Sequence, residues 1–197
     1  MIRLATPADA ARVAAVYRPG VEHSAASFEE VAPGPDDMAR RIETPLATHP
    51  WIVMEAAGTV AGYAYASPHH ARAGYRWSVN TSVYVDEAHH GRGISRALYT
   101  SLFAILRGQG FLNAYAGIAV PNPASVGLHE SMGFRLVGIY EGVGYKLGAW
   151  RDVGWWHLAL APLPAEPPLP RLLPDLQSSS EWPTLLAAGV AGAPTQP

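Results

Sequence analysis

The chain has 197 residues, of which 49% are hydrophobic, 14 are Lys or Arg and 16 are Asp or Glu, giving a formal net charge of -2. This length suits one ordinary domain with an appendage, and the near-neutral charge argues against general electrostatic binding to nucleic acid or an anionic membrane. The absence of cysteine excludes disulfides, cysteine-ligated zinc and thiol nucleophiles, and the lack of a long apolar stretch or signal peptide leads us to expect a cytoplasmic protein without a membrane partner.

The first third of the chain predicts a strand, two helices and a hairpin. Residues 2–4 form a short strand, and Thr6 followed by Pro7 has the form of a helix N-cap with proline at the first helical position. Apolar residues then recur at helical spacing up to position 17. A second helix is expected at 36–43, and two strands, at 51–56 and 60–66, are joined by a short turn.

The middle of the chain continues as alternating strands and helices. The expected order is a strand at 77–85, a helix at 93–107, a buried strand at 114–120, a helix from Asn122 to Gly133, and strands at 135–145 and 153–160. Residues 1–160 are therefore predicted to form one mixed α/β domain, with a single sheet and packed helices.

Proline is concentrated beyond that domain, because nine of the 18 prolines follow residue 160. Such a composition is typical of an extended chain, so residues 161–197 are predicted to form a Pro-rich tail that is extended or partly disordered. A tail that lies on the domain and a recognition peptide are both open interpretations.

The most informative segment is a glycine-bearing turn that follows the strand at 77–85 and opens into the next helix. Gly91 and Gly93 allow close approach to the backbone, and the first amides of the helix point at one spot. Arg92 and Arg96 can add charge at its rim, which predicts an anion site. The turn is not a P-loop, and Arg96 breaks the dinucleotide-binding pattern, whereas a plain helix cap is the structural alternative.

Several motifs together resemble a known family. The turn His90-Gly-Arg-Gly-Ile-Ser95 resembles the acetyl-CoA motif of the GNAT N-acetyltransferases, and residues 122–134 resemble the second signature of that superfamily. Residues 77–85, 98–100 and 144–155 are similar to phosphinothricin N-acetyltransferases within it. The resemblance extends in order over residues 2–160, so it implies a mixed α/β fold whose mostly antiparallel central sheet is splayed to hold acetyl-CoA, with helices on both faces.

The resemblance also implies a set of residues that bind acetyl-CoA. These are the strand before the turn, the turn with the start of its helix, and the start of the later helix: Val83, Tyr84, Val85, His90, Gly91, Arg92, Gly93, Ile94, Ser95, Arg96, Asn122 and Ser125. His90 replaces the usual leading Gln or Arg, so we expect weaker affinity for acetyl-CoA. Ser95 replaces a closing Gly or Ala, which costs little because its backbone amide is unchanged. Asn122 is also a helix-cap residue type, and the two roles are compatible.

The implied catalytic residues include one departure from the family. His129 matches the proton donor to the CoA thiolate, whereas Asn80 stands where the family has a glutamate base and cannot take a proton. A water chain, a backbone carbonyl or a nearby histidine would have to replace that base, unless the acceptor amine has a low pKa. Tyr84 is expected to position the amine or the thioester carbonyl, or to be a core aromatic.

Substrate contacts follow from the same resemblance. Phe28 and Arg72, together with Asn80, match substrate-binding positions, and a guanidinium suits a carboxylate. His70 replaces an expected lysine. The pair His69-His70, like the pair at 89–90, predicts no metal site, because adjacent side chains point apart and no acidic set joins them.

The resemblance implies an acetyl-CoA-dependent N-acetyltransferase that acts on the α-amine of a small amino-acid-like molecule, of the phosphinothricin or methionine sulfoximine type. Without a cysteine, transfer is expected to be direct within a ternary complex. A homodimer is expected, with residues 142–156 near the interface, and no nucleic-acid or membrane partner. The alternatives are a weak or inactive acyl-CoA-binding protein and a peptide or protein N-acetyltransferase.

Overall fold

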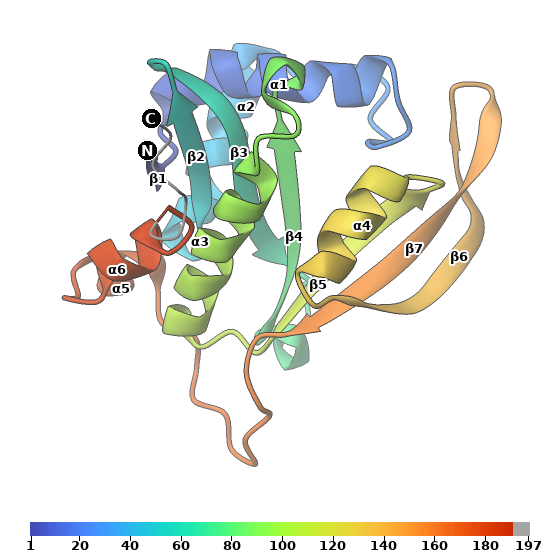
Figure 1. The fold of residues 1–197 in the computed structure, drawn as a ribbon. Helices are drawn as coiled ribbons and strands as arrows, with labels where there is room; N and C mark the ends of the chain where they lie inside the picture. Colours follow the sequence, from blue (N-terminus) through green and yellow to red (C-terminus); the bar gives the residue numbers. More distant parts are fainter. Residues whose placement is uncertain (191–197) are drawn as a thin grey trace.

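The computed structural model describes residues 1–190, and its centre is one seven-stranded sheet (Figure 1). The strands lie in the order β1-β2-β3-β4-β5-β7-β6, and all neighbouring pairs except β4 and β5 are antiparallel. Their bounds are β1 Ile2–Leu4, β2 Trp51–Ala56, β3 Thr59–Pro68, β4 Ser78–Val85, β5 Asn113–Val120, β6 Arg135–Lys146 and β7 Ala149–Ala159.

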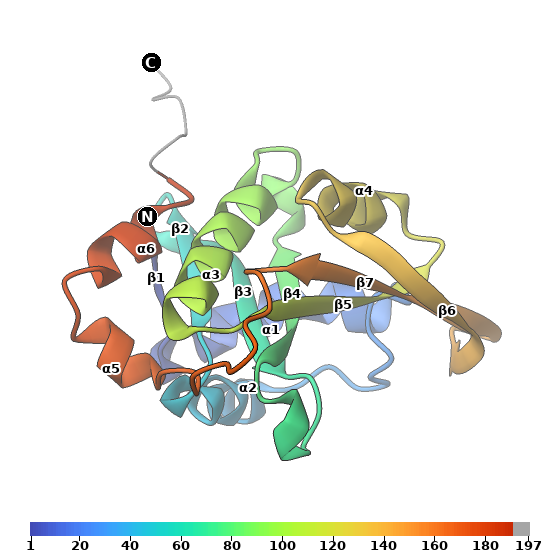
Figure 2. The same ribbon diagram turned by 90° about the horizontal axis from the view of Figure 1, so that it is seen from below.

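Helices cover both faces of this sheet. The α-helices are α1 Ala10–Glu22, α2 Pro35–Glu43, α3 Ile94–Gln109, α4 Pro123–Ser131, α5 Leu173–Gln177 and α6 Trp182–Ala187. Seen from below, α1 and α2 lie under the sheet and α3 and α4 lie above it (Figure 2). The predicted mixed α/β fold with a mostly antiparallel sheet and helices on both faces is therefore confirmed.

Strand alternation explains how one sheet supports two cores. Ile52 and Ala64 face the cluster built around α3, whereas their chain neighbours Val53 and Tyr63 face the cluster built around α1 and α2. All four side chains are almost fully buried. Because successive residues of a strand point to opposite faces, strands covered on both sides become hydrophobic at nearly every position.

The sheet opens between β4 and β5, its one parallel pair within residues 1–190. These strands pair only from Ser78 opposite Asn113 to Asn80 opposite Tyr115. Beyond Asn80, β4 continues to Val85 and β5 to Val120 without pairing to each other. The backbone of residues 81–85 therefore has an edge that faces an opening within the sheet.

The segment after residue 160 is more ordered than its composition predicts. Residues 161–172 form neither helix nor strand, but α5 and α6 follow and lie beside α3. Leu173 and Leu176 on α5 are fully buried in the α3 core, and the Ser101 hydroxyl donates a hydrogen bond of 2.7 Å to the Leu186 carbonyl. Burial of apolar side chains against α3 thus stabilises α5 and α6, two helices that the sequence of the tail alone did not indicate. The last predicted tail residues, 191–197, lie outside the described residues.

No helix within residues 1–190 combines the length and the hydropathy needed to cross a membrane.

Candidate active site

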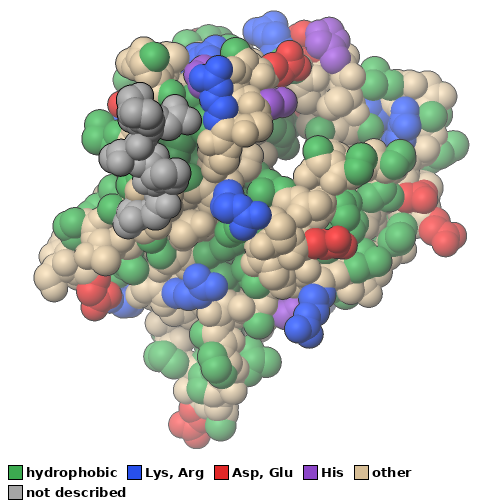
Figure 3. Space-filling view, viewed as in Figure 1, with side chains coloured by type: hydrophobic (Ala, Val, Ile, Leu, Met, Phe, Trp, Pro, Cys, Tyr) green, Lys and Arg blue, Asp and Glu red, His purple; other side chains and the backbone are tan. Residues whose placement is uncertain are grey.

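Two adjoining cavities lie where β4 and β5 separate. The long cleft, of about 670 Å³, runs from the turn at His90 to His129 on α4, and the side pocket, of about 490 Å³, lies beside Phe28 and Asn80. They share part of their walls: Ala26, Thr81, Ser82, Gly117 and Ala119. In the space-filling view the surface is hollowed between α3 and α4, and Lys, Arg and His side chains are scattered around the hollow without forming a continuous patch (Figure 3).

One end of the long cleft is the glycine turn predicted to bind an anion. Gly91 and Gly93 both have left-handed backbone conformations, with φ of +73° and +75°, which favour glycine. Gly93 is the N-cap of α3, so the first amides of that helix are left without intrahelical partners at its positive end. This geometry suits a phosphate or pyrophosphate.

The side chains around this turn are held by the protein itself. His90 donates a hydrogen bond of 2.9 Å from Nε2 to the Val85 carbonyl, at the end of β4. Arg96 reaches across to α4, where its guanidinium donates to the Ser131 hydroxyl at 2.7 Å. Arg92 is exposed and does not line the cleft. The groups that the turn presents to an anion are therefore mainly backbone amides rather than free cationic side chains.

The free edge of β4 forms one wall of the cleft. Val83, Tyr84 and Val85 all line it, and the Tyr84 side chain packs edge-on against Tyr17 and stacks on Tyr63. Burial raises the pKa of the Tyr84 phenol well above its usual range. Tyr84 is therefore both a cleft residue and a member of the aromatic packing under the sheet, and its role in positioning the amine or the thioester carbonyl stays a prediction.

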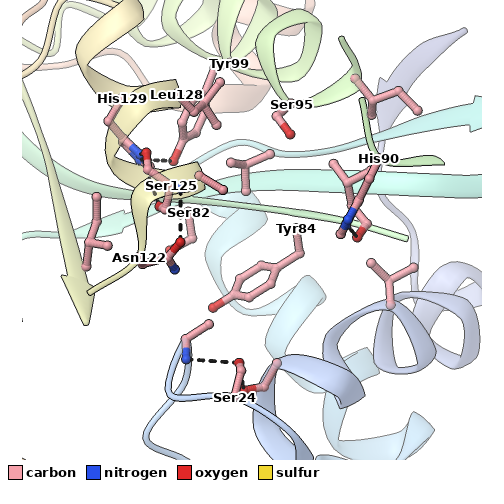
Figure 4. Close-up of a pocket in the computed structure, with 18 of the residues that line it drawn as sticks. Ser24, Ser82, Tyr84, His90, Ser95, Tyr99, Asn122, Ser125, Leu128 and His129 are labelled. Atoms are coloured by element: carbon pink, nitrogen blue, oxygen red, sulfur yellow. Dashed lines mark hydrogen bonds between the residues drawn. The ribbon is translucent and has the colours of Figure 1, made fainter. Parts of the chain in front are cut away.

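The helix α4 forms the opposite wall and begins with a capped turn. The Asn122 side chain accepts a hydrogen bond of 3.1 Å from the Ser125 amide, which leaves its NH₂ group available to the cleft (Figure 4). Pro123 at the first helical position strengthens the same start. Asn122 thus stabilises the helix while it lines the cleft.

His129 lies one helical turn beyond Ser125 and is 4% exposed. Its Nδ1 donates to the Ser125 carbonyl at 2.7 Å, so the neutral ring can only accept at Nε2, where the Tyr99 hydroxyl lies 3.0 Å away (Figure 4). Burial lowers the pKa of His129 below its ordinary value, against the opposing effect of the Ser125 carbonyl. The neutral imidazole is thus held between a carbonyl and a phenol.

The side pocket is walled by aromatic and small polar residues. Phe28 lies against Gly144 of β6 so closely that a Cβ on this glycine would overlap its ring. Beside it, the Lys146 ammonium donates to the Glu29 carbonyl. These two contacts hold the loop after α1 against the β6–β7 hairpin, beside the pocket that Phe28 lines.

Asn80 lines the side pocket, and its Oδ1 lies 2.8 Å from Nδ1 of His69. Arg72, by contrast, lies on the exposed loop between β3 and β4 and lines neither cavity. Its predicted contact with a substrate carboxylate stays a prediction. Within residues 1–190 no group of three or more His, Cys, Asp or Glu side chains is placed to hold a metal ion.

The structure brings most of the predicted residues together and adds others. The predicted residues that line the long cleft are Val83, Tyr84, Val85, His90, Gly91, Gly93, Ile94, Ser95, Arg96, Asn122, Ser125 and His129. Tyr99 and Ser82 line it as well, and sequence reasoning missed both. Tyr99 falls inside the apolar stripe of α3, where a tyrosine is indistinguishable from a core residue.

Comparisons with known proteins agree with this geometry. A family model described as an acetyltransferase (GNAT) domain matches residues 2–155. The chain is 40% identical to phosphinothricin N-acetyltransferase of Streptomyces viridochromogenes over 166 residues, which are 84% of this chain and 90% of that protein. It is 36% identical to the L-methionine sulfoximine/L-methionine sulfone acetyltransferase of Salmonella typhimurium over 160 residues, covering 81% and 94% of the two chains. The crystal structure of a GNAT superfamily phosphinothricin acetyltransferase from Sinorhizobium meliloti in complex with AcCoA matches with a TM-score of 0.82 and 33% identity, covering 89% and 96%.

Proposed function

The chain belongs to the GNAT acetyltransferase family and is an N-acetyltransferase that uses acetyl-CoA, and we propose that its acceptor is the α-amine of a small amino-acid-like molecule of the phosphinothricin or methionine sulfoximine type. The observation that carries this proposal is the side pocket that adjoins the long cleft at the point where β4 and β5 part. The names of the relatives supply the chemical class of the acceptor.

The long cleft fits acetyl-CoA on features of this chain. The unpaired edge of β4 at Val83 and Val85 offers backbone groups to an amide-containing arm, and the turn at Gly91 and Gly93 offers amides to a pyrophosphate. Asn122 faces the same arm from α4. Bound acetyl-CoA supplies an activated acetyl group, and this chain's residues orient it and handle the protons.

The shared wall of the two cavities supports direct transfer in a ternary complex. An amine in the side pocket reaches the long cleft past Ser82 and Gly117, which line both. The sequence contains no cysteine to carry the acetyl group between them. Initial rates measured against both substrates are expected to give intersecting reciprocal plots, whereas parallel plots would indicate a covalent acetyl-enzyme.

Tyr99 and His129 are the proposed source of the proton for the CoA thiolate. They form a hydrogen-bonded pair on the wall of the long cleft. In the neutral state the Tyr99 hydroxyl donates to Nε2 of His129, so this hydroxyl has to turn from Nε2 to the cleft to give its proton to the thiolate. We assign delivery of the proton to the pair rather than to His129 alone.

We propose a small acceptor rather than a peptide. Phe28 lies against Gly144, and Lys146 is bonded to the Glu29 carbonyl, so the loop after α1 and the β6–β7 hairpin are joined beside the side pocket. We also propose that Phe28 and Arg72 contact the substrate. For Arg72 this contact requires the exposed loop that carries it to move toward the side pocket.

A homodimer through β6 is also proposed. This strand lies at the edge of the sheet and carries a row of exposed apolar side chains, seen as hydrophobic atoms over the β6–β7 hairpin in Figure 3. Tyr145 and Val137 are 59% and 65% exposed, and Trp150 on β7 is 69% exposed. Contiguous apolar surface of this kind marks an association site. Sedimentation of the wild type and of Tyr145→Asp tests it: a dimer that the substitution converts to monomer is expected. The cytoplasmic location and the absence of nucleic-acid and membrane partners stay predictions.

A thiol-release assay over an amine panel tests the proposed function. Phosphinothricin, methionine sulfoximine, ordinary amino acids and a short peptide are offered with acetyl-CoA. Turnover is expected with the small amino-acid-like amines and not with the peptide. Binding of acetyl-CoA without turnover at any pH would instead support the inactive acyl-CoA-binding alternative that Asn80 raises.

A further inference from the structure

The side pocket lacks an obvious base, although the proposed reaction needs one. An amino-acid amine is protonated at neutral pH and cannot attack a carbonyl until it loses a proton. Among the residues that line the pocket, the only titratable side chains are Tyr65 and Tyr140. Burial raises the pKa of Tyr65, which makes it a poor proton acceptor. The base must therefore stand behind the lining residues or come from elsewhere.

His69 lines neither cavity itself and contacts the wall of the side pocket through Asn80. Ser67 pairs with Asn80 in the sheet register, and two residues further along the chain His69 lies on the same face. The Nδ1 atom of His69 lies 2.8 Å from Oδ1 of Asn80, and an amide oxygen can only accept. The proton of the neutral ring is therefore on Nδ1, which leaves the lone pair on Nε2.

The packing around His69 fixes the ring. It stacks on Tyr115 with centroids 4.4 Å apart and meets Trp155 edge-on at 6.0 Å. Trp155 itself lines the side pocket. Tyr75 contacts the ring from the loop before β4, so the titratable groups that face His69 are Tyr75 and Tyr115. Within residues 1–190, the His69 side chain has one hydrogen-bond partner, Asn80, which it contacts through Nδ1.

We propose that His69 is the general base that takes the proton of the acceptor amine, and that Asn80 is the positioning residue that fixes its tautomer. This inference rests on the proposed function. It assigns a chemical role to a residue that none of the sequence motifs singled out for catalysis. It also explains how a pocket with an amide at position 80 can serve an ammonium substrate.

The proton balance of the reaction is as follows. The ammonium group gives one proton to Nε2 of His69, and the free amine attacks the thioester carbonyl carbon. A C–N bond forms and the C–S bond breaks. The sulfur takes a proton from the Tyr99–His129 pair, the second proton that the nitrogen loses as the amide forms replaces it on that pair, and the proton held by His69 leaves to solvent. One amide, one thiol and one released proton result from one ammonium and one thioester.

The experiment compares pH profiles of kcat/KM for the acceptor amine in matched histidine variants. The variants are His69→Ala, Asn80→Asp and the control His157→Ala. His157 is a suitable control because it packs on the other side of Tyr115, with centroids 4.9 Å apart, and its Nε2 lies 2.9 Å from Oδ1 of Asn113. It therefore repeats the histidine–asparagine arrangement at an asparagine that lines neither cavity, whereas Asn80 lines the side pocket.

We expect His69→Ala to lose about 100-fold in kcat/KM, the lower end of the usual contribution of a general base, and to lose the acid limb of the profile. Added imidazole is expected to restore part of the activity. Asn80→Asp keeps an acceptor for Nδ1 and adds a charge that favours the imidazolium, so its acid limb is expected at higher pH. His157→Ala is expected to keep the wild-type profile. Calorimetric binding of acetyl-CoA is expected to be equal in all four proteins.

Three results would overturn the proposal. The first is wild-type activity in His69→Ala, and the second is an unchanged acid limb in Asn80→Asp. The third is loss of the limb in His23→Ala, because His23 is an exposed histidine that lines the long cleft and is a rival base. A wild-type protein that binds acetyl-CoA but acetylates no amine would contradict the proposed function itself, and this role with it. If His69→Ala fails to fold, the Asn80→Asp profile alone decides.

Discussion

The Tyr99 hydroxyl and the Nε2 atom of His129 lie 3.0 Å apart on the wall of the long cleft and connect α3 to α4. Both side chains are buried, and His129 is oriented by the Ser125 carbonyl of its own helix. A buried phenol and a buried neutral imidazole form a pair that holds a proton without carrying a charge. This pair is the basis of the first two predictions.

Substitution of either member should lower turnover more than affinity for acetyl-CoA. We expect Tyr99→Phe and His129→Ala each to reduce kcat by about 10- to 100-fold, because the thiolate then leaves without its proton donor. Calorimetry should show little change in the Kd of acetyl-CoA. Tyr17→Phe is the control, since it removes another buried hydroxyl, one that bonds to Ser27 and Glu29. Equal losses in all three variants would point to a general packing effect.

The buried neutral His129 should also make the fold sensitive to acid. Burial holds the pKa of its folded state below the ordinary value of about 6.5, so the unfolded chain takes up a proton at a higher pH than the folded chain does. The stability that this creates is present above the ordinary pKa and is lost as the pH falls through that value toward the lower folded one. Burial has the same effect on His49 and His157.

Urea unfolding at pH 7.5 and pH 5.5 checks this. The wild type is expected to lose stability at the lower pH, and His129→Gln should lose less of it because one of the three histidines no longer titrates. The same loss in both proteins would remove His129 from the explanation.

Gly93→Ala tests the anion site at the turn. An L-residue in the left-handed region costs roughly 1–2 kcal/mol, and no protein atom lies within 4 Å of a Cβ built on Gly93. Gly58→Ala is the matched control, because this residue has φ of +77° and equally open surroundings in the hairpin between β2 and β3. Both variants should lose similar stability in urea, but only Gly93→Ala should bind acetyl-CoA more weakly. Equal Kd values in the two variants would place the pyrophosphate elsewhere.

Asn122 has two roles that substitution can separate. Asn122→Ala removes both the helix cap and the amide, so it should cost about 1 kcal/mol of stability and weaken acetyl-CoA binding. Asn122→Ser keeps a cap of similar strength but loses the NH₂ group. We therefore expect the serine variant to unfold like the wild type and to show a raised KM for acetyl-CoA. A wild-type KM in the serine variant would leave Asn122 as a cap alone.

The helix α5 should contribute to the stability of the whole domain. Leu176 is fully buried against α3, so Leu176→Ala is expected to cost about 2–5 kcal/mol in urea unfolding. Leu169→Ala is the control, because Leu169 is 65% exposed on the preceding Pro-rich segment. Equal unfolding midpoints of the Leu176 variant and the wild type would show that the tail folds apart from the domain.

The sequence predicted best those features that depend on residues close together in the chain. Glycine at 91 and 93, the Asn122-Pro123 start of α4 and strand-length apolar runs are local signals, and the structure has the turn, the cap and the strands that they predict. Leu173 and Leu176 gave no such signal, because two leucines in a Pro-rich segment do not make a periodic pattern. Their burial depends on the surface of α3, which is distant in the sequence. The pairing of His69 with Asn80 was equally hidden, since it depends on the antiparallel register of β3 and β4.

The short contact between β4 and β5 has a mechanical consequence for the molecule. Within residues 1–190, strand pairing between the half of the sheet that carries α1 and α2 and the half that carries the β6–β7 hairpin is limited to the three residue pairs from Ser78 opposite Asn113 to Asn80 opposite Tyr115. A molecule bound along the free edge of β4 and against α4 would bridge both halves above this narrow connection. Amide exchange in β7, which does not line the long cleft, is therefore where the stiffening effect of such a molecule on the sheet would be most visible.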